Sequence, residues 1–148
     1  MKVKITLFTL AVFVSVISGS AQEFKIVTIV ESIVPAGVGR SRIIESRQDI
    51  NYRDLTTERT DGTKSDQADV KRGDIKIDHF NETKLLNFYS IAGINFQNIA
   101  SNDAVISSRI NELIKDGWQL AFVSSAVESD AGRNDGEGIF ITRLFFKK

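Results

Sequence analysis

The chain has 148 residues, with no cysteine, one histidine, and 19 basic against 19 acidic residues. Without cysteine a disulfide is impossible, and a zinc site lacks its usual thiolate and imidazole ligands. The basic residues alternate with acidic ones along the chain, so binding to nucleic acid or to an anionic membrane, which needs a concentrated positive field, is not predicted.

The N-terminal residues are typical of a secretory signal peptide. Lys2 and Lys4 form a cationic start, residues 5–17 are an uncharged, mostly apolar run of 13, and small residues lead up to Ala21. Because the run is shorter than the ~20 residues that span a bilayer, we expect cleavage after Ala21 and no stable membrane anchor. No cysteine is available for a lipoprotein anchor, so a periplasmic or extracellular protein is expected.

Residues 22–148 are expected to form a single α+β domain. A β-hairpin is predicted at its start. Residues 23–33 are rich in β-forming residues, with apolar side chains on both alternating sets, as in a strand covered on both faces. Residues 41–46 resume an extended pattern after a turn that contains Pro35 and two glycines.

Residues 47–84 form a long charged insertion, in which 17 of 38 residues carry a charge. Such a long segment inside a compact domain is usually functional or disordered. Alternation over residues 74–80 predicts a short edge strand. Residues 85–96 are predicted as a strand rather than a helix, because Phe88 and Tyr89 favour a pleated surface.

A helix is predicted over residues 102–116, with Ser101 as its N-cap and one apolar face built from Ile106, Ile110, Leu113 and Ile114. Gly117 is expected to end it in a left-handed conformation that folds Trp118 back onto the helix. Residues 118–127 and 139–147 are predicted as an antiparallel strand pair. The predicted fold is therefore an antiparallel sheet of about four to five strands packed on one main helix.

The segment from Asn111 to Leu120, which contains Gly117 and Trp118, resembles part of a bacterial family called domain of unknown function 4177, as does the ending Phe145-Phe146-Lys147-Lys148. The resemblance implies an order of strand, strand, helix with a Gly-Trp pair, strand, strand, and it implies no active site. The long charged insertion and the export signal depart from the family pattern. An export signal with one small domain is also similar to small secreted proteins of the Bacteroidetes.

Several side chains are candidates for binding or catalysis. Arg40 and Arg42, two apart on a strand, are candidate ligand-binding residues for a carboxylate or sulfate, although a solvated face paired with acids of the insertion is favoured. Glycines 37 and 39 invite a phosphate-loop interpretation but lack the Gly-Lys-Ser/Thr ending. Residues 130–137 carry the oxygen ligands of a calcium site in the wrong register, so a flexible loop is favoured. His79 lacks a nucleophile pattern around it. No cofactor and no metal are predicted.

The final strand is apolar on both faces, which one helix cannot cover. The favoured hypothesis is therefore an exported, non-enzymatic domain whose second sheet face meets a protein partner, another copy of the chain, or the charged insertion. The alternative is a periplasmic small-ligand-binding protein or enzyme, in which residues 47–84 act as a lid over a pocket between helix and sheet. This alternative depends on the length of the insertion.

Overall fold

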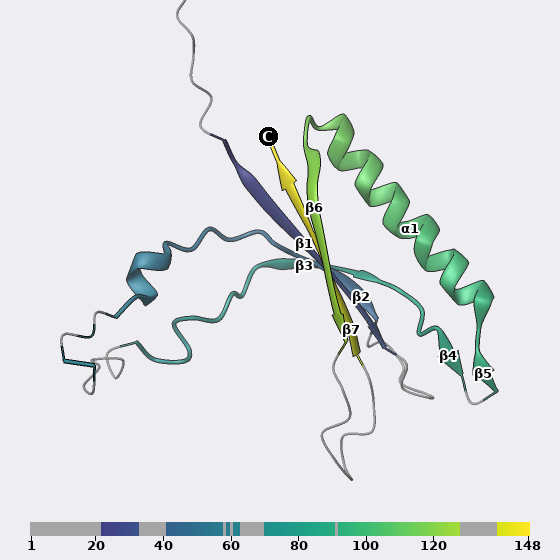
Figure 1. Ribbon diagram of the computed structural model, residues 1–148, viewed down its shortest axis with the longest axis horizontal. Coiled ribbons are helices and arrows are strands. Elements are labelled where there is room, and N and C mark those ends of the chain that lie inside the picture. Colours follow the sequence, from purple (N-terminus) through teal and green to yellow (C-terminus); the bar gives the residue numbers. More distant parts are fainter. Residues whose placement is uncertain are drawn as a thin grey trace, which may run out of the picture.

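The computed structural model describes residues 22–32, 41–57, 59, 61–62, 70–90, 92–127 and 139–148. Within them, one α-helix packs against a five-stranded antiparallel sheet in the order β3-β2-β1-β7-β6 (Figure 1). This confirms the predicted fold class. The sheet strands are β1 (Phe24–Ser32), β2 (Arg42–Ser46), β3 (Phe80–Lys84), β6 (Gln119–Val127) and β7 (Ile139–Lys147).

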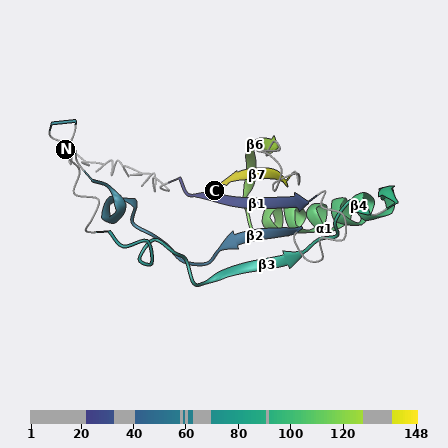
Figure 2. The same ribbon diagram turned by 90° about the horizontal axis from the view of Figure 1, so that it is seen from below.

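The smaller elements lie in the long connection between β2 and the helix. A four-residue 3-10 helix, η1 (Tyr52–Leu55), interrupts the charged insertion. A two-stranded hairpin of β4 (Tyr89–Ser90) and β5 (Gly93–Ile94) leads into the helix. Figure 2 shows the described parts of residues 47–79 extending from one end of the sheet, and β4 with the start of the helix lying at the other end.

Two predicted strands need correction. The edge strand expected at residues 74–80 is instead β3, which begins at Phe80, because its position is set by pairing with β2 and not by local alternation. The continuous strand expected over residues 85–96 is wrong: this region contains only the short β4–β5 hairpin, and the helix begins at Phe96.

The helix, α1 (Phe96–Lys115), starts earlier than the predicted residue 102. Its N-cap is Asn95, whose side-chain oxygen accepts hydrogen bonds from the backbone N–H groups of Gln97 and Asn98. Ser101 is not the cap; its hydroxyl donates to the Gln97 carbonyl inside the helix. An asparagine side chain thus satisfies the first free N–H groups, and the helix begins six residues before the predicted start.

The end of α1 has the predicted geometry. Gly117 has a φ of 90°, its N–H donates to the Ile114 carbonyl, and the Trp118 N–H donates to the Leu113 carbonyl. These two bonds are those of a Schellman motif, which satisfies carbonyls at the helix end. Trp118 is buried as a result.

The hydrophobic core lies between α1 and one face of the sheet. Residues opposite each other in antiparallel strands share a face. The pairs Val27–Leu144 and Ile29–Ile43 therefore place the central parts of β1, β2 and β7 under the helix. The buried apolar side chains are Val27, Ile29, Ile43, Leu85, Leu113, Trp118, Leu144 and Phe146. None of them comes from β6 or β3.

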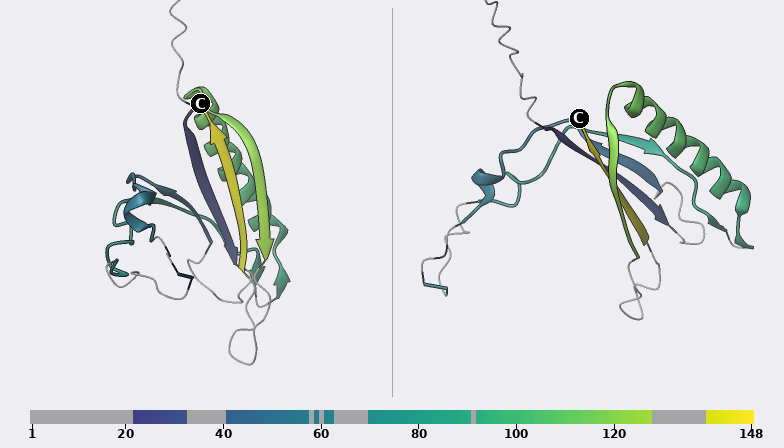
Figure 3. Two further views of the ribbon diagram at one scale, coloured as in Figure 1. Left: turned by 60° about the vertical axis from the view of Figure 1, so that its left-hand side comes forward. Right: turned by 45° about the horizontal axis from the view of Figure 1, so that its top comes forward.

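The other face of the sheet is not covered by α1, which lies on one side only (Figure 3, left). The strand registers place eight large apolar residues on this second face, which we call the open sheet face: Phe24, Ile26, Val30, Ile44, Phe80, Phe122, Ile141 and Phe145.

The helix end provides a test of backbone strain. Replacing Gly117 with valine should destabilise the domain by about 1–2 kcal/mol, because a β-branched residue is disfavoured at positive φ. Gly73→Val is the matched control, since a side chain at Gly73 meets nothing within 4 Å and its φ is not in the positive region. Urea unfolding of both variants measures the difference. Equal stability of the two would contradict the assignment of strain to Gly117.

Candidate functional site

Of the two arginines proposed as a ligand site, the structure describes only Arg42. Arg40 lies outside the described residues. Arg42 lies on β2, where its Nη1 donates to Glu82 Oε1 on the neighbouring strand β3 at 2.6 Å. Glu82 belongs to the charged insertion, so one donor of Arg42 is engaged by an acid of that segment.

Most of the other candidates fall on residues that the structure does not describe. The glycine turn at 37–40 and the acidic loop at 130–137 lie outside the described residues. The His79 side chain is exposed just before β3, and the backbone carbonyl of this residue accepts a hydrogen bond from the Arg47 N–H. Among the described residues, no three His, Asp or Glu side chains converge as metal ligands would.

A buried polar cluster fastens the start of α1 to the sheet. The Asn102 side chain is almost fully buried; its oxygen accepts from the Leu86 N–H, and its nitrogen donates to the Leu86 carbonyl and to Glu31. The hydroxyl of Ser41 accepts from the Ser32 N–H and donates to Asn87. Every such bond stays within the protein, and no buried side-chain polar atom in the described residues lacks a partner. The cluster is therefore structural, because no group is left to bind a ligand.

A second polar contact joins α1 to β2. Arg109 donates from Nε and Nη2 to the two carboxylate oxygens of Glu45, both at 2.6 Å, and from Nη1 to Glu112 at 2.7 Å. These hydrogen bonds, with that to Glu45 the stronger, raise the pKa of Arg109 above its ordinary value. Glu45 lies on the core side of β2 and is nearly buried. The arginine thus neutralises a carboxylate that the packing of the helix has removed from water.

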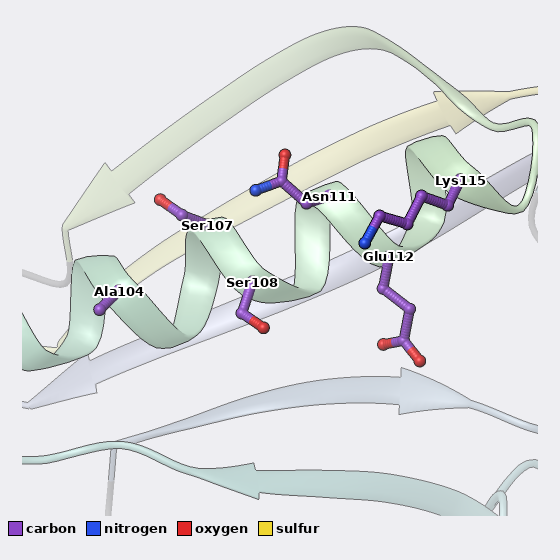
Figure 4. A pocket seen from close by; sticks show the side chains of 6 residues that line it. All are labelled: Ala104, Ser107, Ser108, Asn111, Glu112 and Lys115. Carbon is purple, nitrogen blue, oxygen red and sulfur yellow. The ribbon is translucent and has the colours of Figure 1, made fainter.

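The concave parts of the surface are shallow. The hollow in Figure 4 lies on the solvent side of α1, where the side chains of Ser107, Asn111 and Lys115 point outward. A hollow of about 390 Å³ lies between α1 and Thr83 of β3. A third, of about 360 Å³, is mainly apolar and is lined by Ile44, Phe80 and Ile77, the last from the charged insertion. None of these hollows collects a catalytic set of side chains.

Trp118 has cations on its ring rather than an open binding surface. Lys25 Nζ lies 4.6 Å from the ring centroid and Lys148 Nζ lies 5.9 Å from it. Lys148 also donates to the Asp116 carbonyl at the helix end, at 2.8 Å. The ring therefore packs between the end of α1, Lys25 near the start of β1, and the C-terminal residue Lys148.

The open sheet face is the largest unusual feature of the described surface. Phe24 is 61% exposed, Ile26 48% and Phe122 62%. The Phe122 ring lies 5.7 Å from that of Phe145, so the apolar side chains adjoin one another. Exposed apolar side chains that adjoin one another in this way often mark a binding site.

No protein family, curated protein or solved structure matches this chain. The resemblance to domain of unknown function 4177 therefore stays a prediction. Within the described residues, no helix combines the length and the apolar character that crossing a membrane requires. The basis for a function is thus the geometry of the surface.

The ion pair of Arg109 is expected to be important for stability. Arg109→Met should cost about 3–5 kcal/mol, because it leaves the Glu45 carboxylate buried without a counter-charge. The double variant Arg109→Met with Glu45→Met should regain much of that loss. Arg42→Met is the control: its pair with Glu82 has the same 2.6 Å distance but is more exposed, so a change of about 0–1 kcal/mol is expected. Denaturant unfolding measures all three, and equal losses for Arg109→Met and Arg42→Met would contradict this role.

Trp118 is expected to stabilise the fold rather than bind a ligand. Trp118→Ala should cost about 3–5 kcal/mol, because it removes a large buried side chain. Thermal unfolding measures the loss. Any association measured at an equal folded fraction should be unchanged. A variant with native melting temperature and abolished binding would instead make Trp118 a recognition residue.

Proposed function

We propose that this chain is an exported, non-enzymatic domain that acts by protein–protein interaction or self-association, through the part of its sheet that α1 leaves uncovered. The observation that carries this proposal is the open sheet face. Each large apolar side chain on it would contribute about 1.5–3 kcal/mol if a partner covered it fully. The export signal at residues 1–21 is the basis for the proposed location in the periplasm or outside the cell.

The arrangement of polar groups supports an interaction role over catalysis. Buried polar side chains in the described residues bond to one another, as Asn102 and Arg109 do. An active site usually holds polar groups with unmet bonding capacity in a concave pocket. The surface of this protein instead offers a broad apolar area with charged residues such as Arg143 and Lys147 on the same face. Arg143 lies in the middle of β7, opposite Thr28 and Ser124, so the face combines apolar side chains with a central arginine. Aromatic residues and arginine are both enriched in protein interfaces.

The alternative function, a small-ligand-binding protein with residues 47–84 as a lid, has one observation in its favour. Ile77 of this segment helps to line the apolar hollow beside Ile44 and Phe80. The described parts of residues 47–79, however, extend away from α1 rather than across it (Figure 3, right). A lid would therefore close over this hollow on the open side of the sheet, and not over a pocket between helix and sheet.

Ile26→Lys tests the interaction role. Ile26 is half exposed in β1, so the lysine should change the stability of the dilute monomer by no more than about 0.5 kcal/mol. Because it places a charge on the open sheet face, it should weaken association that uses this face. Light scattering of the mature protein at micromolar concentration measures association, and urea unfolding measures stability. Ile94→Lys, at a similarly exposed apolar site in the separate β4–β5 hairpin, is the control and should leave association unchanged.

Two outcomes would contradict the proposal. A mature protein that is a monomer at micromolar concentration would rule out self-association through this face. A loss of more than about 2 kcal/mol in the dilute Ile26→Lys monomer would mean that the chain itself covers this face, since only a buried site penalises a charge so strongly.

A further inference from the structure

β6 is an edge strand that is exposed on both faces. It is the last strand of the sheet, and all nine of its residues are exposed. Leu120, Val123 and Val127 lie on the side of α1, yet they remain 42%, 46% and 56% exposed, because the helix covers β1, β2 and β7 instead. Phe122 lies on the open sheet face. A central strand would bury its side chains on one or both faces of the sheet.

The hydrogen-bond pattern of β7 identifies which backbone groups of β6 point to the free edge. Glu23 and Lys148 exchange two backbone hydrogen bonds, and such pairs alternate along an antiparallel ladder. With the β1–β7 register, Leu144 therefore bonds toward β1, and Arg143 and Phe145 bond toward β6. Val123 of β6 lies opposite Leu144, and Ser125 and Val127 lie opposite the next alternate residues of β7. These three β6 residues therefore direct their N–H and C=O groups away from the sheet.

The two edge strands of the sheet, β3 and β6, differ in how well they are protected against pairing with another chain. Natural edge strands usually avoid pairing with other chains by being short or by carrying charges or proline. β3 has five residues and includes Glu82 and Lys84. β6 has nine residues, Gln-Leu-Ala-Phe-Val-Ser-Ser-Ala-Val, with no charge and no proline, and its one irregularity lies near its start, between Leu120 and Phe122. The β6 edge is thus open to an added strand along most of its length.

An extended polypeptide is the ligand that such an edge recognises, because only another strand matches its row of donors and acceptors. A second copy of β6 fits particularly well. An uncharged strand places no like charges opposite each other when it pairs with itself. Centring the pair on Ser125 sets Val123 opposite Val127 of the second copy and uses the regular part of the strand. Centring it on Val123 would bring the irregularity near residue 121 into the pairing.

We propose that β6 pairs antiparallel with β6 of a second copy, centred on Ser125, to form a ten-stranded sheet. This inference rests on the proposed function, since it names a second copy as the partner and β6 as the contact. Ile26 lies on β1, outside this contact, so Ile26→Lys should leave a β6 dimer intact. The two-fold axis of such a pair is perpendicular to the sheet, so both α1 helices lie on one side and both open sheet faces lie on the other. A strand pair of this length buries less than the roughly 1,200–2,000 Å² of a standard interface, so the dimer is expected to depend on concentration.

The absence of native cysteine makes cross-linking a clean test. In the proposed pair the two Ser125 Cα atoms are about 5.5 Å apart, within the range that a disulfide spans. Ser125→Cys should therefore form a covalent dimer when the mature protein is oxidised at micromolar concentration. Val123→Cys alone should not, because the two Val123 positions are separated by about 13 Å along the strand direction. A mixture of Val123→Cys and Val127→Cys chains should cross-link to each other.

A charge variant tests the same contact without a covalent cross-link. Ser125→Lys places two ammonium groups opposite each other in the dimer and should weaken it by about tenfold or more, as measured by light scattering over a concentration series. Thr83→Lys, on the opposite edge strand β3, is the control and should leave the dimer unchanged.

The outcomes separate this inference from the proposed function. If the native chain self-associates but Ser125→Cys does not cross-link and Ser125→Lys has no effect, the β6 pairing is wrong, while association through the open sheet face stands if Ile26→Lys abolishes it. Cross-linking of Val123→Cys alone would overturn the register centred on Ser125. A native chain that stays monomeric overturns both the pairing and self-association.

Discussion

A single α-helix is about 10 Å wide, whereas five strands spaced about 4.8 Å apart span about twice that width. One helix therefore covers only the middle of such a sheet. In this protein the covered strands are β1, β2 and β7, and they supply all the buried apolar side chains of the sheet. The second face and the two edge strands are left to solvent or to a partner. The surface that we propose for interaction is a direct consequence of this mismatch in width.

Polar contacts determine where on the sheet the helix lies. Apolar packing is not directional, so it would tolerate some sliding of α1 across Val27 and Ile43. The double hydrogen bond from Arg109 to Glu45 and the three hydrogen bonds of Asn102 are directional, and each is satisfied in one position only. Removing either partner would leave a buried polar group without a bond. These contacts tie the helix to β1 and β2 and hold it away from β6.

The parts of the fold that sequence patterns predict are those fixed by local chemistry. Gly117 and Trp118 define the helix end because a left-handed glycine is needed there, and β1, β6 and β7 are long runs of β-forming residues. The predicted helix start is wrong because Ser101 is one of several polar residues that could cap a helix, whereas Asn95 is the cap and Asn98 in the first turn bonds to the Asn87 carbonyl. The predicted position of β3 is wrong because the strand is positioned by its pairing with β2.

The candidate site likewise has one feature that the sequence predicts and others that it does not. Apolar residues on both faces of β7 predict an uncovered sheet face from sequence alone, since period-two alternation assigns each residue to a side. The ion pair of Arg42 with Glu82 could not be predicted, because it depends on the register between strands separated by the charged insertion. The exposure of β6 could not be predicted either. It requires the strand order, in which the chain places β7 rather than β6 beside β1.

That strand order also links the edge of β6 to the open sheet face. Phe122 belongs to both, since it lies on the edge strand and contacts Phe145 on the open side. Pairing at the edge satisfies backbone groups but leaves the side chains above the sheet in water, so two joined copies would present twice the apolar area of one copy on the same side. Soluble monomers seldom expose more than about 300–600 Å² of such surface. A dimer formed through β6 would therefore have a stronger tendency than the monomer to bind a further protein on its open side, and edge pairing and face binding would reinforce each other.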